Sequence, residues 1–432
     1  MMKDNDHRLT CSEDKKNKIR MTKKDTQLRH SNMVVRCYEC KIVERKLNKK
    51  QHEELDMLFV EGKWFYNHAL NMKKNGIHLR DINTTHIKTV KHFDKDKNPI
   101  ESELRYLSSQ QKQALVQRMI SNEKTIRSLV KNKFQDHGSL QFKSELNCIP
   151  LKQYGNSYVF KSANKIRISG ISGKIRVKTG GQLDNVDELA NANLIHRPDG
   201  YYLKVTCYID KSKIVPIKKN GKEIGLDFGI KTNITTSEGE KLDVSIEESE
   251  RLKKLQAKLG NQKKGSNRRY KTIKRIRREY LNLSNKKKDK ANKIVHKFKQ
   301  YDTIVIQDEQ LSEWHKQKGM SKVVQHSCMG MIKSKLKQLD NVIVLDKYIP
   351  TTKWCPCCHK MSELSLSDRT YKCECGYEQD RDIHAAQNML AIKNLVEKNL
   401  KVPTEHRDGV LKYIKRDMFC EAEHVVKLRH LQ

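Results

Sequence analysis

The sequence predicts an α/β chain of several domains, with a β-rich region that helices interrupt and a second region of alternating strands and helices. Its 432 residues are enough for about three domains at roughly 150 residues each. Apolar residues recur at helical spacing between residues 48 and 133, and short alternating runs lie on both sides of that stretch. After residue 222, short continuous apolar runs are typical of buried parallel strands.

The first region is predicted to begin after a polar, unpatterned and flexible basic tail of 32 residues. MVVRCYECKIV, residues 33–43, alternates and is rich in β-branched side chains, which predicts a strand. Between residues 139 and 216, the runs LQFKS, KIRVK and YYLKVTCYI also predict strands. Pro-Asp-Gly at 198–200 predicts a hairpin turn. We expect the strands before and after the helices to share one barrel-like domain.

In the second region, IGLDFGI and TNITTS predict the start of a β-hairpin. IVIQ and VIVLD predict buried parallel strands. Leu252, Leu255 and Leu259 fall on one helical face, and a break at Gly265 and Ser266 separates that helix from a second one. A further helix is expected to run from the acidic segment at residue 380 to about residue 398.

The charge indicates a polyanionic partner. The chain carries 88 Lys and Arg against 52 Asp and Glu, a formal charge of +36, while 36% hydrophobic content argues against wholesale disorder. Residues 251–300 hold 20 basic residues and only two acids, Glu279 and Asp289. A solvated, Lys-rich helical hairpin is the competing interpretation. The missing acids favour a bound phosphate backbone, which would supply the opposite charge.

Membrane insertion and secretion are not expected. No apolar run approaches the ~18 residues of a membrane span, and the first residues lack the apolar segment of a signal peptide. We therefore expect a reducing, cytoplasmic compartment, in which clustered cysteines indicate metal binding rather than disulfides.

Three acids lie at predicted element ends. Asp227 is in the first strand of the second region between two glycines, Glu309 follows IVIQ, and Asp382 begins the last helix. Each alone has a simple explanation as a turn former or a helix cap. Together they fit a site for two divalent cations about 4 Å apart, which need carboxylate oxygens and leave room for phosphate and water.

Two pairs of cysteines have the spacing of a zinc ribbon. Cys355-Pro-Cys-Cys358 is followed after fourteen residues by Cys373-Glu-Cys375, and two such turns can close a tetrahedral thiolate site. Cys357 competes as a ligand within the first turn. Four thiolates leave no open position, so the predicted zinc is structural. Cys37-Tyr-Glu-Cys40 has similar spacing, but without a second pair nearby it is interpreted as structural.

GLDFGIKTNI, the basic segment LKKLQAKLGNQKKGSNRRYKTIKRIRREY, IVIQDEQLSEWHK, PTTKWCPCCHK and CGYEQDRDIHAAQNML resemble the TnpB family. The resemblance runs from about residue 33 to 411, and the DRDxxAAxN block after a zinc ribbon is its most specific part. TnpB proteins are transposon-associated, RNA-guided DNA endonucleases related to miniature type V CRISPR effectors. The resemblance therefore implies that the chain is an enzyme of this kind.

The resemblance also implies a domain organisation. A wedge-like β-barrel domain interrupted by a helical recognition domain would precede a RuvC-like nuclease domain of RNase H fold with an inserted zinc ribbon. The expected bounds are 1–32 for the N-terminal tail, 33–47 and 134–220 for the wedge-like domain, 48–133 for the recognition domain, 221–350 and 377–411 for the nuclease domain, 351–376 for the ribbon and 412–432 for the C-terminal tail.

By resemblance, the catalytic acids are Asp227, Glu309 and Asp382, which would bind two Mg²⁺ ions. The place after the central strand reads Gln307-Asp308-Glu309. If that strand continues, residues 307 and 309 share a face and Asp308 points away, which favours Glu309. The structural Zn²⁺ would be held by Cys355, Cys358, Cys373 and Cys375. The residues expected to bind nucleic acid are Lys263, Lys264, Arg268, Arg269, Lys274, Arg275, Arg277 and Arg278.

The implied partners are a guide RNA and a target double-stranded DNA with a short adjacent motif, in a prokaryotic cytoplasm where DNA binding would place the chain at the nucleoid. The sequence leaves open whether the chain is a monomer or a homodimer. It also leaves three other functions open: a CRISPR-associated miniature type V effector, a non-cleaving RNA-guided DNA-binding repressor, and a cut-and-paste transposase. The intact acid trio argues against the repressor, and a transposase would need no guide RNA.

Overall fold

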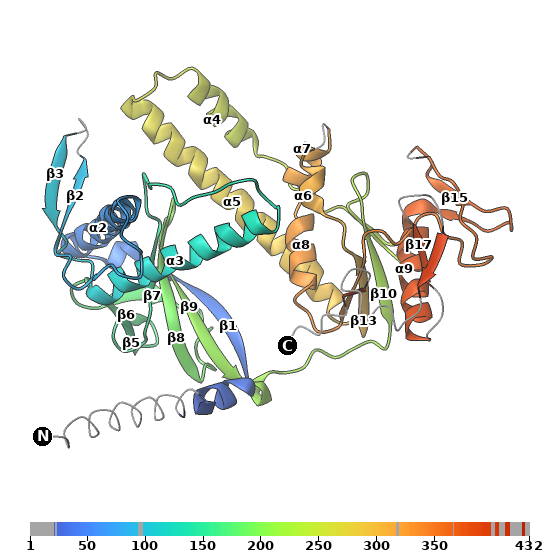
Figure 1. The fold of residues 1–432 in the computed structure, drawn as a ribbon, viewed down its shortest axis with the longest axis horizontal. Coiled ribbons are helices and arrows are strands. Elements are labelled where there is room, and N and C mark those ends of the chain that lie inside the picture. Colours follow the sequence, from blue (N-terminus) through green and yellow to red (C-terminus); the bar gives the residue numbers. More distant parts are fainter. Residues whose placement is uncertain are drawn as a thin grey trace, which may run out of the picture. The chain divides into compact units, whose positions relative to one another are not determined.

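The computed structural model describes residues 21–427, except for 22–23, 94–97, 317–318, 366, 399–401, 406–410 and 415–425. Most of both predicted terminal tails, 1–32 and 412–432, therefore lies outside the described residues. The chain divides into two compact units, residues 1–215 and 216–432, and Figure 1 labels many of the elements of each. Within the described part, no helix is both long enough and apolar enough to span a membrane.

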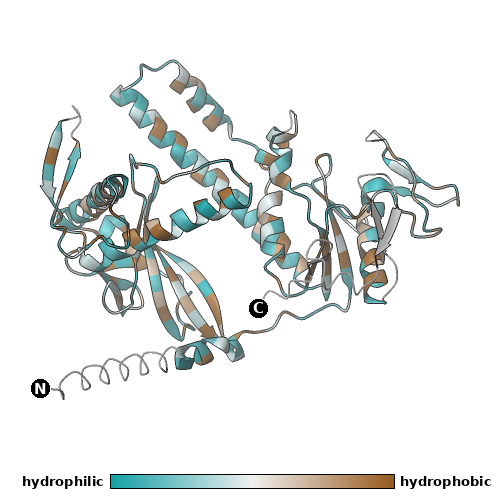
Figure 2. Ribbon diagram, viewed as in Figure 1, coloured by the Kyte–Doolittle hydropathy of each residue, from teal (hydrophilic) through white to brown (hydrophobic). Residues whose placement is uncertain are grey.

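The first unit is built on a seven-stranded sheet with the order β4-β8-β9-β1-β7-β6-β5. Every pairing in it is antiparallel. Buried and partly exposed side chains alternate along β9, a pattern that Figure 2 shows as alternating hydropathy. The strands are β1 (Met33–Ile42), β4 (Cys148–Leu151), β5 (Tyr158–Ser162), β6 (Lys165–Ile168), β7 (Ile175–Lys178), β8 (Glu188–Arg197) and β9 (Gly200–Asp210).

The predicted hairpin turn at residues 198–200 is confirmed. Arg197 pairs with Gly200 across a two-residue turn between β8 and β9. Two short 3₁₀ helices, η1 (Glu44–Lys46) and η2 (Lys211–Lys213), follow β1 and β9. Residues 24–31 are helical, where the sequence predicts part of a flexible tail. The ring of His30 stacks on that of Tyr208 at 3.8 Å between centroids, which ties this helix to the sheet.

Two long helices pack on the same hydrophobic core as the sheet. Asn48 and Ser108 begin α2 (Lys49–Lys74) and α3 (Ser109–Lys131), and each closes a capping box with a glutamine three residues later. Leu58 and Met119, one from each helix, are fully buried in that core. The helical prediction for residues 48–133 is thus confirmed at its two ends.

Between these helices lies an antiparallel hairpin, β2 (Thr89–Phe93) and β3 (Pro99–Glu103), where the sequence analysis predicts helix. The prediction is wrong here because the hairpin is stabilised by a distant residue: the ring of Trp64 on α2 stacks on His92 at 4.0 Å. The strand predicted for LQFKS is also wrong, since residues 140–144 form no strand. The side chain of Asn67 instead pairs with both the N–H and the carbonyl of Lys143, in place of a neighbouring strand.

The second unit contains a six-stranded sheet with the order β12-β11-β10-β13-β14-β19. β10, β13 and β14 are parallel, and β11 is antiparallel to β10, which confirms the predicted hairpin and buried parallel strands. The strands are β10 (Glu223–Phe228), β11 (Ile234–Thr236), β12 (Lys241–Leu242), β13 (Thr303–Gln307), β14 (Val342–Leu345) and β19 (Val426–Lys427).

Helices cover both faces of this sheet, which explains why the three middle residues of β13 are all apolar. Ile304 and Ile306 face a core shared with α5 and α8, whereas Val305 faces a core shared with α9. The helices of this unit are α4 (Glu250–Gly260), α5 (Asn267–Phe298), α6 (Leu311–Trp314), α7 (Met320–Gln325), α8 (Met329–Leu336) and α9 (Arg381–Glu397). Two small hairpins complete it, β15 (Thr370–Lys372) with β16 (Glu378–Asp380) and β17 (Val402–Glu405) with β18 (Leu411–Ile414).

Candidate active site and metal centre

Close packing of α9 on β10 brings the first and third predicted acids toward each other. A Cβ at Gly225 would lie 2.0 Å from the carbonyl oxygen of Ala386, so only glycine lets the helix approach this strand. Ala386 is itself fully buried. Asp227 lies two residues beyond Gly225 on the strand, and Asp382 lies in the first turn of the helix. The glycine before Asp227 thus positions the site.

The three residues of the DRD segment have different contacts. Asp380 is the helix cap, and its Oδ1 accepts from the N–H groups of Asp382 and Ile383 at 3.0 and 3.2 Å. Arg381 donates to the carbonyls of Ser365 and Asp368, which lie between the two cysteine pairs in sequence, each at 3.2 Å. Because Asp380 already caps the helix, the capping explanation does not account for Asp382.

Gln307, Asp308 and Glu309 are consecutive in sequence, but their side chains make contacts with different parts of the second unit. The strand ends at Gln307, whose buried amide donates to the carbonyls of Asp346 and Ile349 at 3.0 and 2.7 Å. Asp308 forms an ion pair with Lys337. Glu309 lies beyond the end of the strand. The prediction assumed that the strand continues to residue 309, so the alternation of side chains along a strand does not explain the position of Glu309.

Glu309 is instead held by a lysine that the sequence analysis missed. Lys333 on α8 donates to the Oε2 of Glu309 at 2.6 Å and to its carbonyl oxygen at 2.7 Å. Only 5% of the Lys333 side chain is exposed. The one available sequence signal was a basic residue between Ile332 and Leu336 on the buried face of a helix.

Glu309 and Asp382 both act on the charge of Asp227. Burial raises the pKa of Asp227 well above its ordinary value of 3.8, and repulsion from Glu309 and then Asp382 raises that pKa further. Arg381 and Lys333 oppose this shift. Burial also raises the pKa of Glu309, against the effect of Lys333. Glu309, which follows β13, and Asp382 of α9 therefore both lie close enough to Asp227 of β10 to act on its charge.

A buried hydroxyl adjoins Asp227. Thr235 on β11 is the direct cross-strand partner of Asp227, and its side chain is 1% exposed. Among the described residues, its Oγ1 has no hydrogen-bond partner. A buried polar atom without a partner is unusual, and ordered water is the common way to satisfy one.

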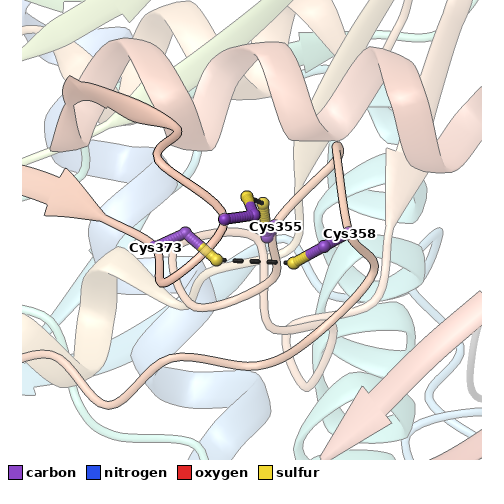
Figure 3. A group of neighbouring side chains, drawn as sticks. Cys355, Cys358 and Cys373 are labelled. Atoms are coloured by element: carbon purple, nitrogen blue, oxygen red, sulfur yellow. Dashed lines mark hydrogen bonds between the residues drawn. The ribbon is translucent and has the colours of Figure 1, made fainter.

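The four predicted cysteine ligands are brought together, and Figure 3 labels three of them. The Sγ atoms of Cys355, Cys358, Cys373 and Cys375 all lie within 4.8 Å of one another. Two of these pairs, Cys355–Cys375 and Cys358–Cys373, are 3.7 and 3.4 Å apart. A tetrahedral zinc with Zn–S bonds of about 2.3 Å needs sulfurs about 3.8 Å apart, so the donor set fits. Cys357 is exposed and outside the group.

This cysteine cluster is joined to α9 by buried side chains. The amide nitrogen of Asn388 donates to the carbonyls of Thr351 and Trp354, each at 2.7 Å, in the segment leading to Cys355. The ring of His384 stacks on Tyr371 of β15 at 3.8 Å. Burial lowers the pKa of His384 to about 4, so it is neutral at physiological pH. The cysteine loops therefore support the helix that carries Asp382.

The basic segment forms a helical hairpin of α4 and α5, which lie side by side in Figure 1. The C-terminal part of α5 belongs to the core through Val295 and Phe298, while its N-terminal part buries only Thr272 and Ile276. Arg269 differs from the other predicted nucleic-acid ligands, because its guanidinium donates to the carbonyls at the end of α4. The exposed members of the predicted set are Lys263, Lys264, Arg268, Lys274, Arg275, Arg277 and Arg278.

Two family descriptions match this part of the chain. Residues 206–313 match the family described as "Probable transposase", of the OrfB_IS605 type, and residues 327–389 match "Cas12f1-like, TNB domain". The chain is TnpB-like. The two matched segments of this TnpB-like chain contain the three acids, the four clustered cysteines and the basic hairpin.

One curated relative of the TnpB-like chain is a protein of Streptomyces pristinaespiralis named "Putative RNA-guided DNA endonuclease". The two are 26% identical over 205 residues, 45% of this chain and 50% of the relative. The TnpB-like chain thus matches about half the length of that relative. A solved chain in the cryo-EM structure of the Cas12f1–sgRNA–target DNA complex aligns with 83% of this chain and 99% of its own length. Its TM-score is 0.44, at 13% identity.

Proposed function

We propose that this chain is an RNA-guided, metal-dependent DNA endonuclease with a RuvC-like site, which binds a guide RNA and cleaves a target DNA beside a short recognition motif. The carrying observation is that close packing of α9 on β10 brings Asp382 near Asp227, and that Glu309 also lies near enough to act on the charge of Asp227. The TnpB-like segments and the name of the curated relative support the same reaction class. We propose the RuvC-like domain and its zinc ribbon with the bounds given in the sequence analysis.

The donor set suits magnesium. Three carboxylates supply the hard oxygen ligands that Mg²⁺ prefers. The hydroxyl of Thr235, which has no hydrogen-bond partner among the described residues, could pair with a water of the Mg²⁺ hydration shell. Among the described residues, only the four cysteines form a group whose possible ligand atoms all lie within 4.8 Å of one another, so the three acids are more widely spaced than that. A site for two ions about 4 Å apart does not require such close spacing of all three carboxylates, because different carboxylates can bind different ions.

In this proposal, Asp227, Glu309 and Asp382 hold the cations and orient the attacking water. Bound Mg²⁺ would lower the pKa of that water and stabilise the leaving oxygen. Hydrolysis joins the water oxygen to phosphorus, breaks one P–O bond of the DNA backbone and gives a proton to the leaving oxygen. Asp380 and Gly225 have a structural role. Asp380 caps the helix that carries Asp382, and Gly225 lets this helix pack closely on the strand that carries Asp227.

We propose that the clustered cysteines hold a structural Zn²⁺. Their four Sγ atoms lie within 4.8 Å of one another, and thiolates so arranged are a preferred donor set for zinc. Four sulfur ligands leave no open position, so this ion would support the fold and not the reaction.

The decisive experiment is purification of the chain together with RNA transcribed from the DNA that flanks its gene. We expect one defined RNA to copurify, and we expect Mg²⁺-dependent cutting of DNA that matches the guide segment of this RNA. Changing the guide segment should redirect the cut, and a library of flanking sequences should reveal the adjacent motif. Guide-independent strand joining, or a preparation without defined RNA, would contradict the proposal.

We expect the exposed basic residues of the α4–α5 hairpin to contact phosphates of the guide RNA or of its duplex with DNA. A variant with Lys263→Gln, Lys264→Gln, Arg268→Gln and Arg275→Gln should bind the RNA more weakly. The slope of log affinity against log salt should shrink by roughly 0.7 to 0.9 for each lost phosphate contact. Filter binding across salt concentrations measures this slope.

Arg269→Gln is the matched control for that variant. Arg269 contacts the end of α4, so its loss should lower the melting temperature and leave the salt slope nearly unchanged. An unchanged slope in the fourfold variant would show that the hairpin does not contact the phosphates.

A further inference from the structure

Lys333 is buried in a place where a cation is unfavourable unless it has a partner. It lies on α8 between Ile332 and Leu336, both fully buried, and α8 packs against the core of the second unit. The ammonium is 2.6 Å from the Oε2 of Glu309. Transfer of an unpaired ammonium from water to a protein interior is strongly unfavourable, so Lys333 depends on this acid.

The same ammonium contacts the ends of two strands. It is 2.7 Å from the carbonyl oxygen of Glu309, which follows the end of β13, and 5.3 Å from the ring centre of Phe228, the last residue of β10. Phe228 directly follows Asp227. Lys333 thus fixes both the backbone and the side chain of Glu309 where strand pairing has ended, beside the strand that carries Asp227.

The geometry leaves part of Glu309 available. Lys333 contacts Oε2, so Oε1 can still serve as a ligand to one cation. We propose that Lys333 is a positioning residue of the cleavage site, which holds Glu309 in the orientation that the reaction requires. This inference rests on the proposed nuclease function, in which Glu309 binds a cation.

The chain contains a matched control pair on the same helix side. Lys337 is four residues from Lys333 and pairs with Asp308, the neighbour of Glu309. The side chains of Lys337 and Asp308 are 37% and 51% exposed, against 5% and 19% for Lys333 and Glu309. Lys337 therefore offers the same kind of ion pair to an acid outside the proposed reaction.

The test compares Lys333→Met with Lys337→Met as assembled complexes with guide RNA and target DNA. Single-turnover cleavage is measured per bound, folded complex across Mg²⁺ concentrations. Lys333→Met should cut about 10- to 100-fold more slowly at saturating Mg²⁺, with unchanged target binding, as for other residues that orient metal ligands. Lys337→Met should stay within about twofold. A Lys333→Met rate within about twofold of wild type would overturn the proposal.

Thermal unfolding of the free chain separates this proposal from the nuclease function. Lys333→Met should lower the melting temperature by about 5 °C or more, whereas Lys337→Met should change it by less than about 2 °C. Adding Glu309→Gln to Lys333→Met should restore part of the loss, because no uncompensated buried charge remains. No recovery would overturn the Glu309 contact, even in a chain that cuts no DNA. If wild type cuts no guide-matched DNA while recovery is seen, the nuclease function fails and the role of Lys333 reduces to holding Glu309.

Discussion

Asp227→Asn is expected to abolish DNA cleavage while leaving guide RNA and target DNA bound. Asparagine keeps the size of the side chain but removes the charge that the proposed cations need, at the centre of the three interacting acids. We expect the single-turnover rate to fall at least about a thousandfold, equivalent to about 4 kcal/mol of barrier. Cleavage of guide-matched DNA and a binding assay on the same preparation give the two readouts.

The same substitution should not weaken the fold of the metal-free chain. Burial and the repulsion from Glu309 and Asp382 both act against the charged form of Asp227, so replacement by a neutral side chain removes an unfavourable term. We therefore expect the melting temperature without Mg²⁺ to stay equal or to rise. A rate loss accompanied by unfolding would assign Asp227 to the fold and not to the reaction.

Asp308→Asn and Glu309→Gln test which neighbouring acid serves the site. Asp308 pairs with the half-exposed Lys337, so its neutralisation should leave cleavage within about twofold of wild type. Glu309→Gln should be as inactive as Asp227→Asn. The reverse result would move the central acid by one residue and contradict the site described above.

Cys373→Ser is expected to remove zinc from the chain and to destabilise the second unit. Its sulfur is one of four within 4.8 Å of one another, and three thiolates cannot complete the tetrahedral site. Zinc content should fall from about one ion per chain to well below one, and the melting temperature should fall by several degrees or more. Elemental analysis and thermal unfolding measure the two effects.

Cys357→Ser is the control for that prediction. Cys357 lies between two members of the cluster in sequence, but it is exposed and outside the group. Its substitution should leave the zinc content and melting temperature unchanged. Equal zinc loss in both variants would mean that Cys357 replaces one of the four assigned ligands.

Loss of zinc should also reduce cleavage, through α9. Asn388 and His384 connect this helix to the segment before Cys355 and to β15, and Asp382 lies in the first turn of the same helix. Zinc loss should change the affinity for guide RNA less than the cleavage rate, because these contacts of Asn388 and His384 do not involve the α4–α5 hairpin.

The elements that were predicted correctly are those with strong local patterns. β13 and β14 carry short continuous apolar runs, residues 304–306 and 342–345, because helices cover both faces of the sheet. The break at Gly265 and Ser266 was also visible, since Ser266 caps α5. The hairpin β2–β3 and the segment 140–144 were predicted wrongly. In both, distant side chains, Trp64 and Asn67, supply the contacts that set the backbone.

The sequence by itself predicted the three acids, the cysteine pairs and the basic segment as candidate functional residues, because residue type and spacing carry that information. Only the tertiary structure showed the contact of Arg269 with the end of α4, the burial of Thr235 beside Asp227, and the contact of Lys333 with Glu309. Each of these contacts joins groups that are separated in sequence and close only in the folded chain. The burial of such groups follows no repeating pattern along the sequence. A lysine on a buried helical face can be read from the sequence, but the acid that neutralises it can be named only after the strands and helices have packed.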